Sequence, residues 1–191
     1  MPLRTLAIVL ALGLLTAACG DDGDPQLPAD GVALLDHAKW VETKHDDDPF
    51  WAARPTPDPA CAPYSFQIEG FSPETQSIEI DTTACDYLTI GLEIPAAIKR
   101  GDTLELVAWH LRLSADGATE QNPVPGMMAV AVGSNVIWQK SFDIPSAEAS
   151  YVEKLSADFD APAGTLLTFH VHNHGNNNYN LMKVDIVADK P

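Results

Sequence analysis

Basic residues are scarce in this chain of 191 residues, in which 11 Lys and Arg stand against 27 Asp and Glu and give a formal net charge of -16. So acidic a protein is a poor ligand for nucleic acid or for anionic lipid head groups. Cysteine is also rare, with three residues in all, which is too few for a four-cysteine zinc cluster. The apolar run at the N-terminus, residues 5–18, is shorter than the roughly 20 apolar residues that a membrane-spanning helix needs.

The first 19 residues have the pattern of an export signal. Arg4 is followed by residues 5–18 without a charge and then by Cys19, which is the order of a basic n-region and an apolar h-region. The run Leu15-Thr16-Ala17-Ala18-Cys19 resembles the lipobox of bacterial lipoproteins, although Thr16 stands where that family usually has an aliphatic residue. The resemblance implies a signal peptide over residues 1–18 and a diacylglycerol on Cys19. The alternative is a plain cleavable signal.

The residue after the cysteine bears on location. In the lipoprotein family, Asp at this position favours retention in the inner membrane, whereas this chain has Gly20. The resemblance therefore implies a protein anchored in the cell envelope by lipid, at the outer membrane rather than the inner one. Whether the domain faces the periplasm or the outside is left open.

Composition divides the exported part into three segments. Residues 19–30 are acidic and predict a tether. Residues 31–60 predict a partly packed N-terminal extension, because Val32–Leu35 and Trp40–Val41, with Phe50-Trp51, are apolar enough to dock a strand onto the domain. Within it Asp46, Asp47 and Asp48 form a run expected to be solvated. Residues 61–191 predict a single domain.

The sequence pattern of that domain predicts an all-β fold. Short segments rich in β-branched and aromatic residues alternate with turn signals, and Gly133-Ser134 marks a hairpin. The pattern predicts a single antiparallel β-sandwich of the jelly-roll type with about eight or nine strands; residues 146–155 are also compatible with a helix. The predicted strands cover residues 64–71, 77–81, 87–94, 103–113, 128–132, 135–142, 151–159, 165–172 and 181–187. In the fourth strand Val107, Trp109 and Leu111 share one face, which we expect to be the core, although Glu105 has the same parity.

Cys61 and Cys85 remain once Cys19 is assigned to the lipid. An even pair in an exported protein predicts a disulfide, here closing a loop of about 25 residues. Two free thiols, or half of a metal site, are the alternatives.

The segment Phe169-His170-Val171-His172-Asn173-His174 is the most unusual part of the sequence. Alternate residues of a strand share a face, so His170, His172 and His174 should point one way while Phe169 and Val171 point into the core. With His110 from a neighbouring strand, these three histidines form a candidate site for one Zn or Cu ion. A second interpretation is a ligand-binding face, and a third is a solvated polar surface. The ligand face would consist of His172, Asn176, Asn178 and Tyr179, with Trp109 and Trp138 as further candidate sugar platforms.

The whole pattern resembles small lipoproteins of the Gram-negative envelope, in which a lipobox precedes one β-sandwich with a His/Asn-rich segment before its last strand. In strand pattern it also resembles carbohydrate-binding modules built on jelly rolls. The sequence has no Gly-x-Ser-x-Gly motif. We therefore expect no enzyme but a lipid-anchored binding or structural module, with a glycan or an envelope component as partner, and with metal binding as the alternative.

Overall fold

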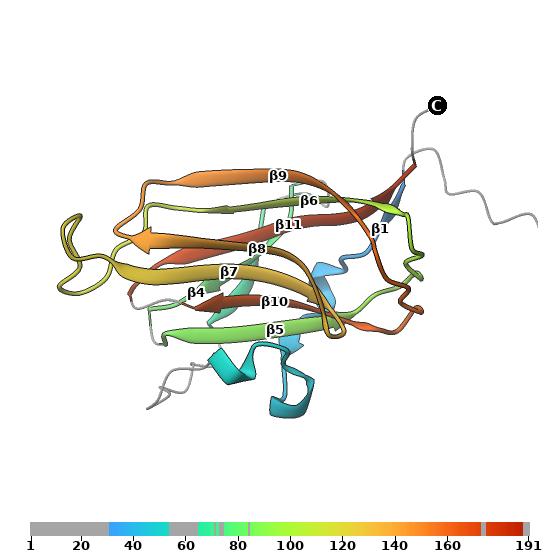
Figure 1. Cartoon of the computed structure of the whole chain (residues 1–191), viewed down its shortest axis with the longest axis horizontal. Coiled ribbons are helices and arrows are strands. Elements are labelled where there is room, and N and C mark those ends of the chain that lie inside the picture. The colour runs from blue at the N-terminus through green and yellow to red at the C-terminus, as the bar shows by residue number, and fades with distance from the viewer. Residues whose placement is uncertain are drawn as a thin grey trace, which may run out of the picture.

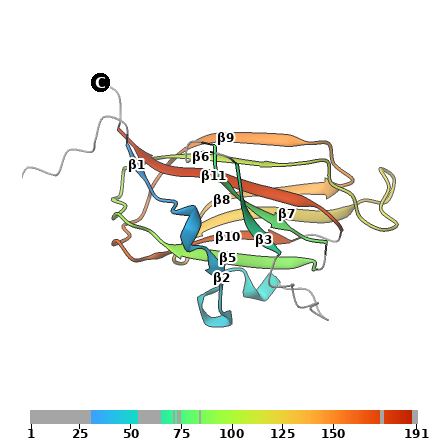
Figure 2. The ribbon, with the colours of Figure 1, turned by 180° about the vertical axis from the view of Figure 1, so that it is seen from behind.

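The computed structural model describes residues 31–53, 65–70, 72, 75–83, 85–172 and 175–188. This part of the chain contains eleven strands in two antiparallel sheets. The predicted signal peptide, the predicted tether and Cys61 lie outside it. The predicted all-β sandwich is confirmed, and Figures 1 and 2 show its two layers from opposite sides.

The first sheet, sheet A, has the order β3-β4-β11-β6-β9, and β1 also pairs with β11. Its strands are β1 (Val32–Ala33), β3 (Phe66–Glu69), β4 (Ser77–Asp81), β6 (Thr103–His110), β9 (Ala149–Ser156) and β11 (Asn178–Val187). Sheet B has the order β2-β5-β10-β7-β8. Its strands are β2 (Val41–Glu42), β5 (Tyr87–Glu93), β7 (Val124–Val132), β8 (Asn135–Ile144) and β10 (Leu166–His172).

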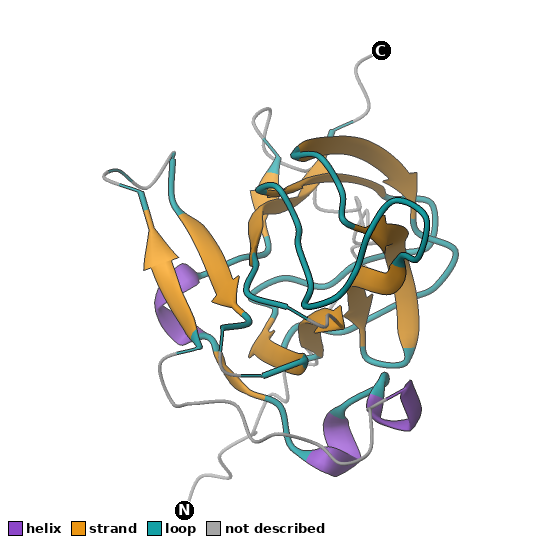
Figure 3. Cartoon of the chain, turned by 90° about the vertical axis from the view of Figure 1, so that its left-hand side faces the viewer, coloured by secondary structure: helices purple, strands orange, loops and turns teal. Residues whose placement is uncertain are grey.

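The nine predicted strands correspond to β3 through β11, and the hairpin at Gly133-Ser134 joins β7 to β8. The segment 146–155, for which a helix was the alternative, is mostly strand β9. Three short 3-10 turns, η1 (His37–Lys39), η2 (His45–Asp47) and η3 (Trp51–Ala53), lie at the periphery of the strands (Figure 3).

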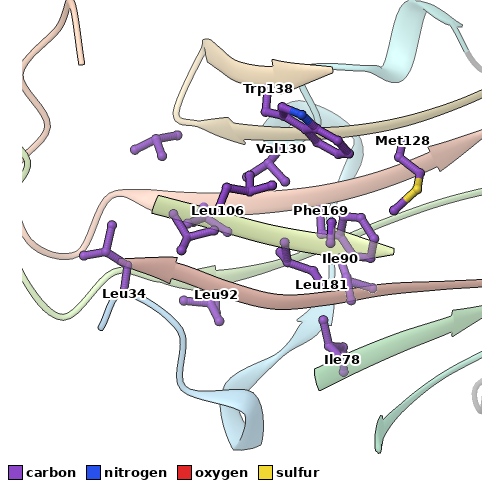
Figure 4. Close-up of a cluster of buried hydrophobic side chains, with 14 of the residues drawn as sticks. Leu34, Ile78, Ile90, Leu92, Leu106, Met128, Val130, Trp138, Phe169 and Leu181 are labelled. Carbon is purple, nitrogen blue, oxygen red and sulfur yellow. The ribbon is translucent and has the colours of Figure 1, made fainter. Parts of the chain in front are cut away.

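The core lies between the sheets. Side chains from β5, β7, β8 and β10 of one sheet meet those from β4, β6 and β11 of the other, as Figure 4 shows for Ile90, Phe169 and Leu181. Phe169 and Val171 are both fully buried there, as predicted. Each such side chain contributes roughly 1.5–3 kcal/mol by leaving water.

The face assigned to β6 is wrong. Leu104, Leu106 and Ala108 are buried between the sheets, whereas Val107 and Trp109 alternate with them and face outward, half-buried. Both parities of this strand are apolar, so the alternation did not decide between them. Glu105 was the informative residue, because it lies on the outer face and bonds Lys183 at 2.6 Å.

Residues 31–53 cross from one sheet to the other. β1 pairs with β11 of sheet A and β2 pairs with β5 of sheet B. Leu34 and Trp40, between these strands, are buried in the core. The segment continues as η2 and η3, which lie beside β5 (Figure 1). We call residues 43–53 the strap.

Cys85 is buried, at 3% exposure. Because Cys61 lies outside the described residues, the pairing of Cys61 with Cys85 stays a prediction. Within the described residues no helix is long and apolar enough to cross a membrane.

We expect Cys85→Ala to lower the free energy of unfolding by about 3 kcal/mol, because a disulfide restricts the unfolded chain. Urea unfolding measures this. Cys61→Ala should cost a similar amount, and the double variant should cost no more than either single one. Single costs that add in the double variant would contradict the disulfide.

Candidate functional site

The four histidines of the predicted metal site do not come together. His110 ends β6 in sheet A, whereas His170 and His172 belong to β10 in sheet B. The expectation that His110 comes from a strand neighbouring β10 is therefore wrong, and His174 lies outside the described residues. Among the residues that the structure describes, no group of three or more His, Cys, Asp or Glu is arranged to hold a metal ion.

His110 is an interior residue, exposed by only 1%. Burial lowers the pKa of its imidazole, so the ring is neutral at ordinary pH. Its Nδ1 donates to the carbonyl of Leu111 at 2.7 Å, and its Nε2 accepts from the Tyr151 hydroxyl at 3.1 Å. Both ring nitrogens are satisfied within the protein, which makes His110 a structural residue.

His170 is on the outer face of sheet B, as the alternation in β10 predicted, but the strap covers it completely. Its ring stacks on Phe50 with centroids 4.4 Å apart and an interplanar angle of 17°, and Tyr87 meets it edge-on at 4.7 Å. Burial, and secondarily the nearby His172, lower the pKa of His170 to about 3. His172, two residues further along β10, is half-buried.

The Asn-rich segment is largely structural. Asn177 is 1% exposed, and its side chain accepts from the backbone N–H of Ser114 at 2.7 Å and donates to the Ser114 carbonyl at 2.9 Å. A Cβ at Gly175 would lie 1.9 Å from that same carbonyl oxygen. The segment after β10 therefore pins the start of the loop between β6 and β7, and this close approach is why a glycine stands at position 175.

The predicted ligand face does not form from its four residues. Tyr179 is fully buried in the core, and burial raises the pKa of its hydroxyl far above its usual value. Asn176 is exposed, and its side-chain oxygen accepts from Thr83 at 2.7 Å. Asn178 is half-buried on β11 in sheet A, and His172 is in sheet B. Trp138, a further candidate platform, is also buried, at 7% exposure.

Trp109 is the tryptophan that the structure places on a solvent-facing sheet. It lies on the outer face of sheet A opposite Ser150 of β9 and Asn180 of β11. The adjacent cross-strand pair on this face is Val107 and Val152, the latter 70% exposed. We call Val107, Trp109, Ser150, Val152 and Asn180 the Trp109 face.

Hydrogen-bonding groups border the Trp109 face. Asn180 accepts from Ser77 at 3.0 Å and donates weakly to Glu79 at 3.5 Å. Lys183 bonds Glu105 at 2.6 Å and Asp185 at 3.2 Å. These ion pairs lower the pKa of Glu105 and raise that of Lys183. The face thus combines a flat aromatic ring with fixed polar side chains.

A cavity of about 490 Å³ opens near one end of the sandwich. It is lined by residues of the loop after β6 and of the β8–β9 connection: Arg112, Glu120, Pro145, Ser146, Ala147 and Glu148. Its charged side chains are exposed. Sequence reasoning missed this cavity, because its walls come from loops far apart in the chain.

No family model and no curated protein matches this sequence. Solved structures do resemble it. A family 11 carbohydrate-binding module from Clostridium thermocellum, in complex with a β-1,3-1,4-mixed-linked tetrasaccharide, has a TM-score of 0.42 and 12% identity over 84% of this chain and 98% of the module. TmCBM61, in complex with β-1,4-galactotriose, has a TM-score of 0.40 and 7% identity over 78% of this chain and 99% of its own.

The arabinose-bound α-L-arabinofuranosidase MgGH51 matches with a TM-score of 0.38 and 10% identity. The match covers 83% of this chain, which spans only 30% of that enzyme. At these values the three likenesses concern the β-sandwich fold alone, and the case for a function depends on the side chains described above.

Proposed function

We propose that this chain is a non-catalytic binding module, held at the bacterial cell envelope by a lipid on Cys19, and that the Trp109 face takes a neutral carbohydrate. The observation that carries the proposal is the placement of Trp109, a large aromatic side chain that β6 turns away from the core. Trp40 and Trp138, in contrast, are buried at 7% exposure.

The chemistry of the face favours a sugar. An indole ring offers a flat apolar surface with a polar edge, which suits the C–H face of a pyranose. Ser150 stands on one side of it, exposed, and can bond hydroxyl groups, since a hydroxyl both donates and accepts. Asn180, on the other side, is 2% exposed, and its amide bonds Ser77 and Glu79, so it holds the edge of the face rather than a ligand. The net charge of -16 disfavours an anionic ligand. A neutral polyhydroxylated ring satisfies all three conditions.

We expect Trp109→Ala to weaken binding to neutral oligosaccharides at least about tenfold, the equivalent of roughly 1.4 kcal/mol. A printed array of neutral hexose and pentose oligosaccharides identifies the ligand, and titration calorimetry measures the dissociation constant. Trp109→Phe should retain part of the affinity, because a smaller aromatic ring remains.

Val136→Ala is the matched control, since Val136 is an exposed apolar residue, at 48% exposure, on β8 of the other sheet. It should bind as the wild type does. If Trp109→Ala folds and binds every oligosaccharide as tightly as the wild type, the Trp109 face is not the site.

A further inference from the structure

The outer face of sheet B beneath the strap carries two polar side chains among small residues. We call His170, Thr168, Gly91, Ala129 and Ala131 the floor. His170 lies between Thr89 of β5 and Ala129 of β7, and Thr168 lies between Gly91 and Ala131 of the same two strands. Gly91, Ala129 and Ala131 have small side chains, and other residues pack closely above them: a Cβ at Gly91 would lie 3.1 Å from Thr43 Oγ1 and 3.0 Å from Leu166 Cδ1.

The strap also places one aromatic ring over this part of sheet B. Phe50 packs with Tyr87, Ala129 and Ala131 in a small apolar cluster that is separate from the main core, and its ring stacks on His170. Asp48 fixes the strap in place, because its carboxylate accepts from the Tyr87 hydroxyl at 2.5 Å and from the Phe50 backbone N–H at 2.8 Å. The acidic run that was expected to be solvated therefore has one buried member.

Several polar atoms under the strap have no partner among the described residues. They are Nε2 of His170, Oγ1 of Thr168 and Oγ1 of Thr43, all buried. The other ring nitrogen of His170 is satisfied, since Nδ1 and the Thr89 hydroxyl are 2.9 Å apart. A buried polar atom without a partner loses its hydration and gains nothing in return. Two of these atoms, His170 Nε2 and Thr168 Oγ1, lie on β10, and the third, Thr43 Oγ1, lies on the strap above it. A ligand bound between the strap and sheet B would supply the missing bonds.

We propose that this floor is a second carbohydrate site, distinct from the Trp109 face, and that the strap covers it with Phe50 in the place of a sugar ring. The six-membered ring of a pyranose is close in size to the phenyl ring that it replaces, and its hydroxyl substituents extend beyond it. Its C–H face would stack on the His170 imidazole, and its hydroxyls would bond Nε2 of His170, Oγ1 of Thr168 and the Tyr87 hydroxyl that Asp48 releases. A neutral ligand suits these groups, because none of them is a cation.

The strap and the sugar compete for one place, so the apparent affinity equals the intrinsic affinity reduced by the fraction of molecules with the strap open. Contacts that hold the strap include the Asp48 bonds, the Phe50 stack and the bond from the Thr43 N–H to the Thr89 carbonyl at 2.9 Å. Removing the Phe50 ring should raise the open fraction and expose the site.

The test uses Phe50→Ala on the same array of neutral hexose and pentose oligosaccharides. We expect binding at least about tenfold tighter than that of the wild type. The gain should disappear in Phe50→Ala/His170→Ala and in Phe50→Ala/Thr168→Val, and it should persist in Phe50→Ala/Trp109→Ala. A folded Phe50→Ala protein that binds no oligosaccharide more tightly than the wild type overturns the proposal.

Asp48→Ala is a milder variant that keeps the Phe50 ring and the Tyr87 hydroxyl and removes only the carboxylate that bonds the Tyr87 hydroxyl and the Phe50 N–H. It should speed amide hydrogen exchange at Phe50 and tighten oligosaccharide binding; faster exchange without tighter binding also overturns the proposal. The two sites fail separately. If the increase in affinity caused by Phe50→Ala is lost in Phe50→Ala/Trp109→Ala, the sugar binds at the Trp109 face alone. If Phe50→Ala increases the affinity and Trp109→Ala leaves the affinity unchanged, the sugar binds at the site under the strap alone.

Discussion

Replacing Cys19 with Ser is expected to move the protein from the membrane fraction to the soluble fraction. A single acyl chain binds a bilayer only marginally, at about 10⁴ M⁻¹, whereas two chains hold a protein stably. The serine variant cannot form the thioether to diacylglycerol, and a net charge of -16 disfavours binding to anionic lipid instead.

Cell fractionation measures the change, and mass spectrometry of the N-terminal peptide shows whether the diacylglycerol is present. Cys85→Ser is the matched control, because it removes a different cysteine and should leave the protein in the membrane fraction. A Cys19→Ser protein that stays with the membrane after a high-salt wash would contradict a lipid anchor at this position.

Lowering the pH from 7 to 4.5 is expected to destabilise the fold through His170. Its pKa is about 3 in the folded protein, against an ordinary value of 6.5. Below pH 6.5 the His170 imidazole therefore binds a proton in the unfolded chain but stays neutral in the folded protein. The stability contributed by the neutral ring is complete above pH 6.5 and is lost as the pH falls toward 3. At about 1.4 kcal/mol per pH unit, the loss at pH 4.5 is about 3 kcal/mol.

The comparison of variants isolates this contribution, because carboxylates and other buried histidines also respond to acid. His170→Gln does not titrate, so its free energy of unfolding should fall by about 3 kcal/mol less than that of the wild type between pH 7 and 4.5. Urea unfolding at both values measures it. His45→Gln is the control, since the side chain of His45 is 60% exposed. Equal losses in His170→Gln and the wild type would show that His170 is protonated in the folded state.

The strands could be predicted from the sequence because their signals are local. Runs of β-branched and aromatic residues end at turns such as Gly133-Ser134, and these features need no knowledge of the partner strand. Which face of each strand is buried was harder to predict. In β10, Phe169 and Val171 alternate with two histidines and predict the core correctly, whereas in β6 both faces are apolar and Trp109 was assigned to the wrong one.

The candidate sites could not be predicted, because they depend on contacts between distant segments. Nothing near His110 in the sequence reveals that β6 joins a different sheet from β10. Likewise, the stacking of Phe50 on His170 joins residues 120 positions apart. The Asn-rich segment stood out for its composition, yet Asn177 serves to hold a loop. The unusual composition thus marked a closely packed turn rather than a ligand-binding surface.

The pairing of β1 with β11 determines at which end of the sandwich the described N-terminal segment begins. Val32 lies opposite Ile186, so the chain enters the sandwich at the same end at which β11 finishes (Figure 1). With the proposed lipid on Cys19, the membrane would be joined to the domain through that end, and the other end, with the loop after β6 and the 490 Å³ cavity, would be the more distant one. Trp109 is next to the last residue of β6, near that distal end. The proposed anchor and the Trp109 face would thereby lie at opposite ends of the strands of sheet A.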